Sequence, residues 1–325
     1  MRSEQKPSRK NPGLGRRRPA LQIIVLFALA AAFALAFSGC ELFPSSAASF
    51  VGTKYAVIVG INDYIDYRVN DLSYCVADAE SMQQMLEDAR WSVTLLTAAS
   101  NESTDKTPTK ERIEAAIKAV PHDTATFLFY YSGHGSKNSP EEAYIVPSDF
   151  DGQTYESMIS SREFSVWLDS VAATNKLVIL DSCHSGGFVD PGDSVDSIID
   201  SSISTSSALD MFFRFGELLA QNAAAASSDP STAPLVISAA GWAEESLEAS
   251  GYGHGIFTYY FLQSAETNQI GTMKGDSDGD DVLSCIEAYS YAKRQLASDP
   301  GISENQKFIP HISGGLRDFA LIDNR

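Results

Sequence analysis

Short apolar runs alternate with segments of helical spacing along most of the chain. The runs are apolar throughout, which is typical of strands that are covered on both faces. They predict strands at 54–60, 91–97, 124–133, 177–181 and 235–241, and the helical spacing predicts helices at 75–88, from Thr107 with proline in the first turn, near 161–170, and at 255–266. Strands that alternate with helices predict an α/β fold, a three-layer sandwich whose central sheet is mostly parallel with helices on both faces.

The start of the chain has the pattern of an export signal. Basic residues precede an apolar run that ends at Phe37, and small residues then precede a cysteine. This order is typical of a secretory signal peptide. Ser38-Gly39-Cys40 resembles a bacterial lipobox, although Phe37 stands where such boxes usually have leucine. We therefore expect an exported chain that is anchored to a membrane of the bacterial cell envelope through lipidated Cys40. A signal cleaved without lipidation and an uncleaved anchor are the alternatives.

Charge is distributed unevenly along the chain. Residues 1–40 hold seven of the 24 Lys and Arg and one of the 42 Asp and Glu, which leaves 17 bases and 41 acids, a net charge of −24, for residues 41–325. A body this acidic repels nucleic acid and favours cationic peptides or metal ions. If Cys40 is lipidated, three cysteines remain, so at least one thiol stays free or pairs outside the chain. A free thiol in an exported protein suggests a functional one.

Composition suggests five segments. They are a signal peptide at 1–40, a Ser/Ala-rich tether at 41–53, a large part at 54–187, an insert at 188–232 rich in Ser, Ala and Asp, and a small C-terminal part of the same domain at 233–325. The insert is too long for an ordinary connection, and we expect it to be mobile apart from the apolar piece 211–220.

Polar stretches follow two of the predicted strands. They are YYSGHGS at 130–136 and DSCHSGG at 181–187. If the two strands are neighbours in a parallel sheet, their carboxyl ends meet and bring His134 to Cys183. A histidine in reach of a thiol can remove its proton and later return it to a leaving amine. The N–H groups of Gly135 and Cys183 would then form an oxyanion hole. A structural histidine and a core cysteine are the alternatives.

The two stretches together resemble the motif pair of metacaspases and bacterial caspase-like peptidases. GINDY with CVADAESM, VISAAGWAEESLEA, and GHGIFTYYFLQS resemble further segments of that family. The resemblance implies a caspase-like cysteine endopeptidase that needs no cofactor for its chemistry. In it His134 is the general base and then acid, and Cys183 is the nucleophile that forms a thioester. A catalytically silent caspase-fold binding module at the envelope and a non-proteolytic thiol enzyme are alternatives from other classes.

The same resemblance suggests the substrates. Metacaspases cleave after Arg or Lys with an acidic pocket, and this chain has Asp181 two residues before the cysteine, as they do. By the resemblance Ser132 and Asp78 also line the pocket. Carboxylates there would pair with a guanidinium or ammonium group. The expected partners are peptides or proteins with a basic residue before the scissile bond. For Asp78, an acid that interacts with the dipole of its own helix is an equal alternative.

One basic residue stands out between the two parts of the domain. From Leu177 to Met273, Arg214 is the only Lys or Arg. In caspases the segment that joins the two parts is cut during maturation. Arg214 is therefore the candidate for self-cleavage, and a short amphipathic helix packed on the surface is the alternative.

Residues 276–287, DSDGDDVLSCIE, fit a calcium-loop template. The template has acids at positions one, three and five, an apolar residue at eight and Glu at twelve. The expected ligands are Asp276, Asp278, Asp280, Glu287 and the carbonyl of Val282. Position six should be glycine but is Asp281, a residue that tolerates positive φ better than most. A solvated acidic loop before a helix is the alternative.

Overall fold

The computed structural model describes most of the chain from residue 52 onward. The described residues are 52–100, 104–139, 142–181, 211–226, 233–239, 252–301, 310–315 and 317–325. They all belong to one compact unit, residues 46–325. Cys40, Cys183 and much of the 188–232 insert lie outside the described residues. Among the described helices, none combines the length and the apolar character that spanning a bilayer requires.

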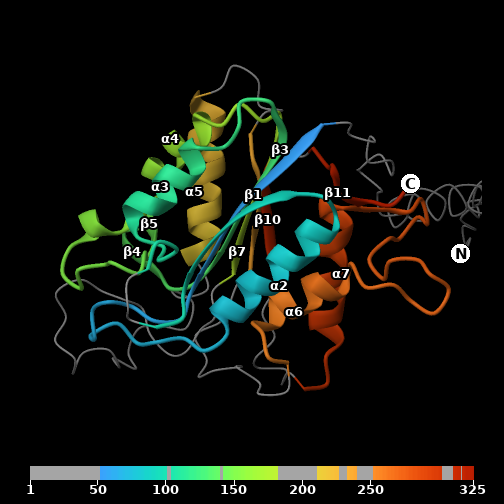
Figure 1. Ribbon diagram of the computed structural model, residues 1–325, viewed down its shortest axis with the longest axis horizontal. Helices are drawn as coiled ribbons and strands as arrows, with labels where there is room; N and C mark the ends of the chain where they lie inside the picture. Colours follow the sequence, from blue (N-terminus) through green and yellow to red (C-terminus); the bar gives the residue numbers. More distant parts are fainter. Residues whose placement is uncertain are drawn as a thin grey trace, which may run out of the picture. The chain divides into compact units, whose positions relative to one another are not determined.

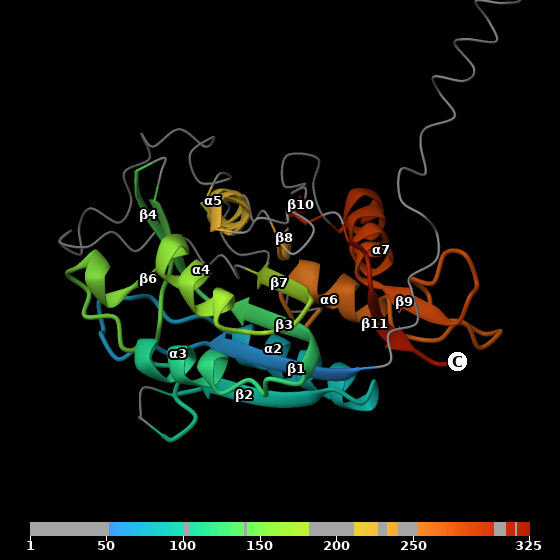
Figure 2. The ribbon, with the colours of Figure 1, turned by 90° about the horizontal axis from the view of Figure 1, so that it is seen from above.

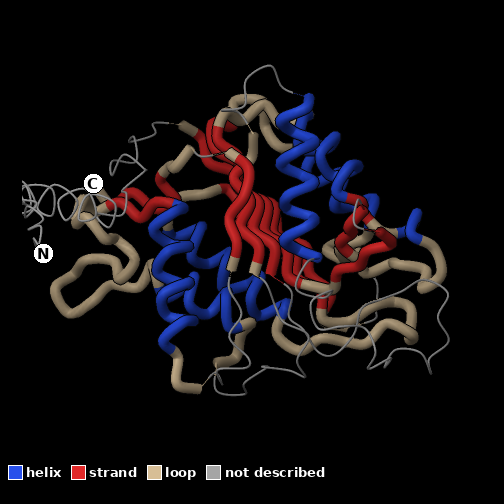
Figure 3. Tube along the Cα trace, turned by 180° about the vertical axis from the view of Figure 1, so that it is seen from behind, coloured by secondary structure: helices blue, strands red, loops and turns tan. Residues whose placement is uncertain are grey.

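A six-stranded sheet forms the middle layer, with strand order β10-β8-β7-β3-β1-β2 (Figures 1 and 3). The strands are β1 Thr53–Ile61, β2 Ser92–Ala98, β3 Thr124–Ser132, β7 Asn175–Asp181, β8 Leu235–Ser238 and β10 His311–Gly314. Five run parallel, and β10 pairs with β8 in the antiparallel sense at one edge. The five predicted strands are confirmed as the parallel ones. β10 was not predicted because its short, half-buried sequence has no apolar run.

Helices cover both faces of this sheet, which confirms the predicted α/β sandwich (Figures 1 and 2). One face is covered by α3 Lys110–Lys118, α4 Ser161–Asp169 and α5 Met211–Ala226, and the other by α2 Cys75–Asp88, α6 Ile256–Gln263 and α7 Cys285–Ser298. Two smaller sheets flank the layers. One contains β4 Gly135–Ser139, β5 Glu142–Ile145 and β6 Ile159–Ser160, next to the 3-10 turn Tyr155–Ser157, and the other pairs β9 Val282–Ser284 with β11 Ala320–Asp323.

The predicted start of the second helix was wrong. α3 begins at Lys110, and Thr109 is its N-cap, in an extended conformation with its hydroxyl accepting from the Arg112 amide. Pro108 therefore precedes the cap instead of lying in the first turn. A side-chain oxygen at the cap satisfies an amide that has no partner within the helix, and this places the boundary at the threonine.

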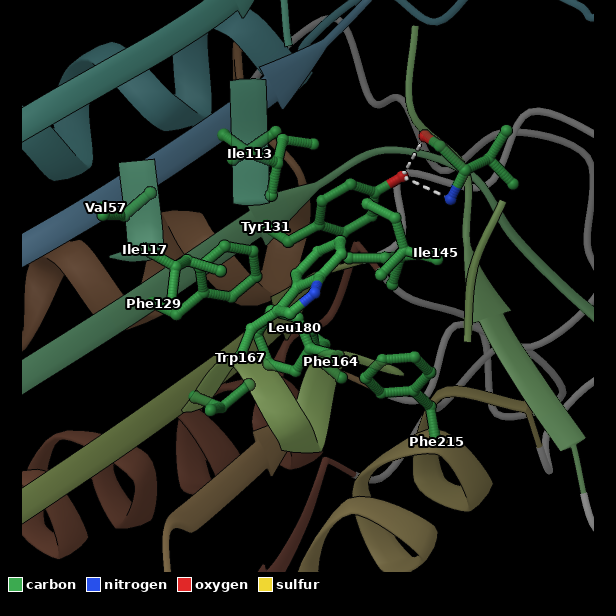
Figure 4. Close-up of a cluster of buried hydrophobic side chains, with 14 of the residues drawn as sticks. Val57, Ile113, Ile117, Phe129, Tyr131, Ile145, Phe164, Trp167, Leu180 and Phe215 are labelled. Carbon is green, nitrogen blue, oxygen red and sulfur yellow. Dashed lines mark hydrogen bonds between the residues drawn. The ribbon is translucent and has the colours of Figure 1, made fainter. Parts of the chain in front are cut away.

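Alternation along β3 sends its side chains to opposite faces of the sheet. Phe129 and Tyr131 pack in the core beneath α3, α4 and α5, together with Trp167 and Phe215 (Figure 4). Tyr130 packs in the other core, beneath α2 and α6. The polar residues at the strand ends follow the same alternation, and this decides which helices they meet.

Candidate active site

The carboxyl ends of β3 and β7 lie next to each other. Ser132, the last residue of β3, is paired with Asp181, the last residue of β7, so the two strands are neighbours as the sequence predicted. His134 follows β3 after one glycine and is only 3% exposed. Cys183 comes two residues after the described end of β7, so its distance from His134 lies outside what the structure describes.

Two buried tyrosines hold the backbone of His134. The His134 amide donates to the hydroxyl of Tyr64 at 2.8 Å, and the hydroxyl of Tyr131 donates to the His134 carbonyl at 2.6 Å. The Tyr64 and His134 ring centroids are 5.0 Å apart. Burial raises the pKa of both tyrosines, so their hydroxyls keep their protons. The sequence marked Tyr64 only as part of the GINDY segment and gave neither tyrosine this role.

Gly133 is required by this arrangement. A Cβ at this position would lie 2.6 Å from the hydroxyl oxygen of Tyr131 and 3.1 Å from that of Tyr64. At Gly133 the neighbouring space is taken by the tyrosines. Gly135 begins β4, where it is paired with Ile145, and its oxyanion role stays a prediction.

The imidazole of His134 is oriented by a backbone carbonyl. Its Nε2 lies 2.7 Å from the carbonyl oxygen of Asn70. Because a carbonyl can only accept, Nε2 must carry a proton, and in the neutral ring the lone pair is then on Nδ1. Nδ1 is therefore the nitrogen that can act as a base. The sequence did not reveal Asn70, because any residue type can supply a main-chain carbonyl.

The loop that carries Asn70 is tied to a distant segment by Arg68. Its guanidinium pairs with Asp66 and donates to the backbone carbonyl of Asp151 at 2.8 Å. The hydrogen bond from Arg68 lowers the pKa of the Asp66 carboxyl. Arg68 thus connects the loop to the segment after β5 and limits where the Asn70 carbonyl can lie.

On the opposite face of the sheet lies a group of polar residues that we call the carboxylate cluster. Its members are Asp78, Ser132, Asp181, His254 and Thr258. Asp78, in the first turn of α2, is fully buried and accepts from His254 Nδ1 at 3.0 Å and from the Ser132 hydroxyl at 3.2 Å. The three residues expected to line an acidic pocket, Asp78, Ser132 and Asp181, are therefore neighbours.

Thr258 of α6 donates two hydrogen bonds to the side chain of Asp181. The Thr258 amide donates to Asp181 Oδ2 at 3.2 Å, and the Thr258 hydroxyl donates to the same oxygen. Tyr130 lies 2.7 Å from that hydroxyl and must be its donor, because the threonine proton points to the carboxylate. Burial and then the charge of Asp78 raise the pKa of Asp181 to about 7, against the opposing effects of Thr258 and His254.

The two carboxylates also cap α6. Asp78 accepts from the amide of Gly255, the N-cap residue, and Asp181 accepts from the amide of Thr258 in the first turn. These amides have no partners within the helix, and negative charge is favourable at a helix N-terminus. The alternative role of Asp78 concerned its own helix, whereas the carboxylate caps a different one. His254 and Thr258 lie in the GHGIFT segment, but sequence reasoning predicted no role for either residue.

The structure brings part of the predicted calcium loop together. Oxygens of Asp276, Asp278 and Glu287 lie within 4.8 Å of one another. Asp280 instead accepts from the Val282 amide at 2.9 Å. Burial, and then the charges of Asp280 and Glu287, raise the pKa of Asp278. Asp281 has φ of 62°, the left-handed conformation that the template requires at its sixth position.

Arg214 lies in the first turn of α5. The next residue, Phe215, is 1% exposed, and its ring centroid lies 5.9 Å from that of Phe164. The peptide bond after Arg214 therefore belongs to a helix packed on the core, and its cleavage would require this turn to unwind.

Comparison with known protein families relates these residues to a single domain. A model of the caspase domain, peptidase family C14, matches residues 53–313. The chain belongs to the caspase domain family. It is 30% identical over 154 residues to Metacaspase-7 of Arabidopsis thaliana, which is 42% of this chain and 36% of that protein. It is 29% identical over 163 residues to Metacaspase-1 of Schizosaccharomyces pombe, 43% of this chain and 35% of that protein. The chain thus spans well under half the length of these curated relatives.

A solved structure shows a looser likeness. A crystal structure of a protein from Geobacter sulfurreducens superposes with a TM-score of 0.49 and 18% sequence identity, over 84% of this chain and 97% of that one.

Proposed function

We propose that this chain is a cysteine endopeptidase that cleaves peptide bonds after Arg or Lys, with His134 and Cys183 as its catalytic dyad. The observation that carries the proposal is the hydrogen bond between His134 Nε2 and the Asn70 carbonyl, in a chain of the caspase domain family. It places the basic lone pair on Nδ1 of a buried histidine at the end of β3. The strand that leads to Cys183 is the neighbour of β3.

The reaction follows from these groups. His134 Nδ1 takes the proton of the Cys183 thiol, and the thiolate attacks the substrate carbonyl carbon. The resulting oxyanion is stabilised by the N–H groups of Gly135 and Cys183. When the carbon–nitrogen bond breaks, the imidazolium gives its proton to the leaving amine and a thioester remains. Water, deprotonated by His134, then hydrolyses the thioester and restores the thiol.

The preference for a basic side chain rests on Asp181 and Asp78, with Ser132 beside them. Two neighbouring carboxylates that are almost completely buried favour a cation, because desolvated negative charge needs a partner. The proposed partners are accordingly peptides and proteins with Arg or Lys before the scissile bond.

Fluorogenic peptides test this function. The full-length chain should release the fluorophore from Arg and Lys peptides and not from the matching Asp peptide, and Cys183→Ala should release none. Cleavage after Asp alone would overturn the specificity. An absence of turnover on every peptide, together with no labelling of Cys183 by a peptide electrophile, would favour the alternative of a silent binding module.

We also propose that the chain is exported and anchored at the bacterial envelope through lipidated Cys40. The support is the sequence order of basic residues, apolar run and Ser38-Gly39-Cys40. Metabolic labelling with a clickable palmitate analogue should mark the wild-type chain and leave Cys40→Ser unmarked. Equal labelling of both would contradict lipidation at this residue.

The loop at 276–287 suits calcium, which we propose as a ligand that the chemistry itself does not use. Asp276, Asp278 and Glu287 would supply carboxylate oxygens, and Asp280 and the Val282 carbonyl would complete the site. Two features support the fit. First, repulsion from neighbouring carboxylates helps to raise the pKa of Asp278, and a divalent cation would relieve this repulsion. Second, Asp281 already has the conformation that the template requires at its tight turn.

A further inference from the structure

Protein donors occupy the acceptor positions of Asp78. Its Oδ1 accepts from His254 Nδ1 and from the Gly255 amide, both at 3.0 Å. Its Oδ2 accepts from the Ser132 hydroxyl at 3.2 Å and from the Gly255 amide at 3.3 Å. A carboxylate offers about four lone-pair directions. Both oxygens of Asp78 thus already accept from the protein, through the ring of His254, the amide of Gly255 and the hydroxyl of Ser132.

Asp181 differs from Asp78 in this respect. Both Thr258 donors reach the same oxygen, Oδ2, and among the described residues none donates to Oδ1. The residue is only 3% exposed. A buried carboxylate oxygen without a donor is unfavourable unless a proton or a cation compensates it. Asp181 Oδ1 is thus the acceptor in the carboxylate cluster that a substrate cation can use directly.

His254 is the member of the cluster that can carry positive charge. Its side chain is 22% exposed, whereas that of Asp78 is 0% exposed. The His254 ring is paired with Asp78, a residue of α2, and it also interacts electrostatically with Asp181, the last residue of β7. α2 and α6 lie side by side on this face of the sheet (Figure 1), and His254 immediately precedes Gly255, the N-cap residue of α6. Histidine is the side chain that normally changes charge between pH 5 and 8.

We propose that His254 is a specificity-determining residue, because its protonation sets how much of the negative charge of Asp78 is available to attract a basic side chain to Asp181. The inference rests on the proposed cleavage after Arg or Lys. Nδ1 donates to Asp78 in either charge state, since a carboxylate oxygen can only accept. Loss of the second proton from the ring therefore changes the charge of the cluster without breaking this hydrogen bond.

The charge of the cluster follows from these states. A protonated His254 offsets the negative charge of Asp78, whereas a neutral His254 leaves that charge to attract a cation. Burial and the charge of Asp78 raise the pKa of Asp181 to about 7, so Asp181 gains negative charge as pH rises through neutrality. Both changes make the cluster more negative and increase its preference for a cation.

A pair of substrates isolates this effect. Citrulline has the shape of arginine without its charge, so the ratio of kcat/KM for an arginine peptide to that for the matching citrulline peptide reports charge recognition. Changes in the His134 and Cys183 protonation affect both peptides and cancel in the ratio. The variant is His254→Asn, whose side-chain amide can still donate to Asp78 but cannot become charged.

We expect the wild-type ratio to fall between pH 8.5 and pH 5.5. At pH 5.5 the ratio for His254→Asn should exceed the wild-type ratio by about tenfold, because one unit of positive charge is missing near the substrate cation. At pH 8.5 the two ratios should agree. The exposed His122 is the matched control, and His122→Asn should behave as wild type at both pH values.

The outcomes separate the two proposals. A wild-type ratio near one at pH 8.5 would overturn cleavage after basic residues itself. A large ratio at pH 8.5 with the same fall toward pH 5.5 in wild type and His254→Asn would overturn the role of His254 alone. If the variant does not fold, NMR of the wild-type chain with histidine labelled at ¹³Cε1 decides. Agmatine, the arginine side chain as a free cation, should lower the titration midpoint of His254, and an unchanged midpoint would contradict the proposal.

Discussion

His134 Nε2 and the backbone carbonyl oxygen of Asn70 lie 2.7 Å apart, although 64 positions separate them in the sequence. The contact fixes the proton on Nε2 and leaves Nδ1 as the base. Asn70 reaches this position because its loop is tied by Arg68 to Asp66 and to the carbonyl of Asp151. The tautomer of the proposed catalytic histidine thus depends on a loop that contains no catalytic residue.

Removing the Arg68 side chain should therefore reduce catalysis more than stability. We expect Arg68→Ala to lower kcat by about tenfold, because small displacements of a catalytic group are costly, and to change the unfolding free energy little, because exposed ion pairs contribute little to stability. Arg325→Ala is the matched control, since Arg325 pairs with Asp323 two residues earlier, as Arg68 does with Asp66. Equal kcat values for both variants, measured with an arginine peptide, would contradict a role for the loop.

Tyr64→Phe should affect both stability and activity. The His134 amide loses its acceptor within a buried site, which costs about 1–3 kcal/mol. His134 is then free to shift, and kcat should fall by about tenfold. Thermal unfolding and peptide turnover measure the two effects. Tyr55→Phe removes a hydroxyl that contacts Thr94 between β1 and β2, and it should leave kcat unchanged. A Tyr64→Phe enzyme with wild-type kcat would rule out positioning by this tyrosine.

The raised pKa of Asp181 predicts how stability depends on pH. Between about pH 4 and pH 7 the folded chain keeps a proton that the unfolded chain releases, so this residue lowers stability as pH rises through that range. Asp181→Asn cannot ionise and still offers an oxygen to Thr258. Its Tm should exceed that of wild type by a few degrees at pH 8, with little difference at pH 4.5. A constant difference across this range would contradict the shifted pKa.

Asp151 provides a comparison of opposite sign. Desolvation acts to raise its pKa, but hydrogen bonds from Gln153, Thr154 and Ser157 outweigh it and lower the pKa to about 2. A depressed pKa adds stability above the unfolded pKa that is lost as pH falls toward 2. The Tm of Asp151→Asn should therefore be lower than that of wild type at pH 8, and this difference should disappear in acid. The same direction of change for both variants would show that charge is not the cause.

Calcium binding by the 276–287 loop can be separated from the helix cap that it contains. Glu287 forms a capping box with Ser284 at the start of α7. Glu287→Gln keeps an oxygen for the cap but loses the ligand charge, whereas Ser284→Ala weakens the cap by about 1 kcal/mol and keeps the carboxylate. Calorimetry should detect calcium binding in wild type and Ser284→Ala and lose it in Glu287→Gln. Calcium titrations of the wild-type chain that release or absorb no heat would show that the loop does not bind calcium.

Self-cleavage remains a prediction that intact-mass spectrometry can test. If the enzyme cuts after Arg214, active wild type should yield two fragments, and Cys183→Ala and Arg214→Gln should stay whole. Because the bond lies in the first turn of α5, we expect cleavage to speed up under mild denaturation that unwinds this turn. An uncut wild type under active conditions would contradict self-cleavage at Arg214.

The sequence alone determined the layers and the order of the main elements. Apolar runs and helical spacing are local properties, so they predicted the five parallel strands and the sandwich. The rule that parallel strands end at one edge predicted that the ends of β3 and β7 meet, and Ser132 is indeed paired with Asp181 there. The edge strand β10 escaped prediction because it lacks a local signal and exists through its pairing with β8.

Only the tertiary structure decided what surrounds these residues. Asp78 and His254 are 176 positions apart, and no periodicity links them. They meet because α2 and α6 pack on the same face of the sheet (Figure 1), where Asp78 and Asp181 satisfy amides at the start of α6. The Asn70 carbonyl likewise has no sequence signature. Residue type and spacing encode local conformation, whereas long-range hydrogen bonds and shared burial depend on the packing of the whole domain.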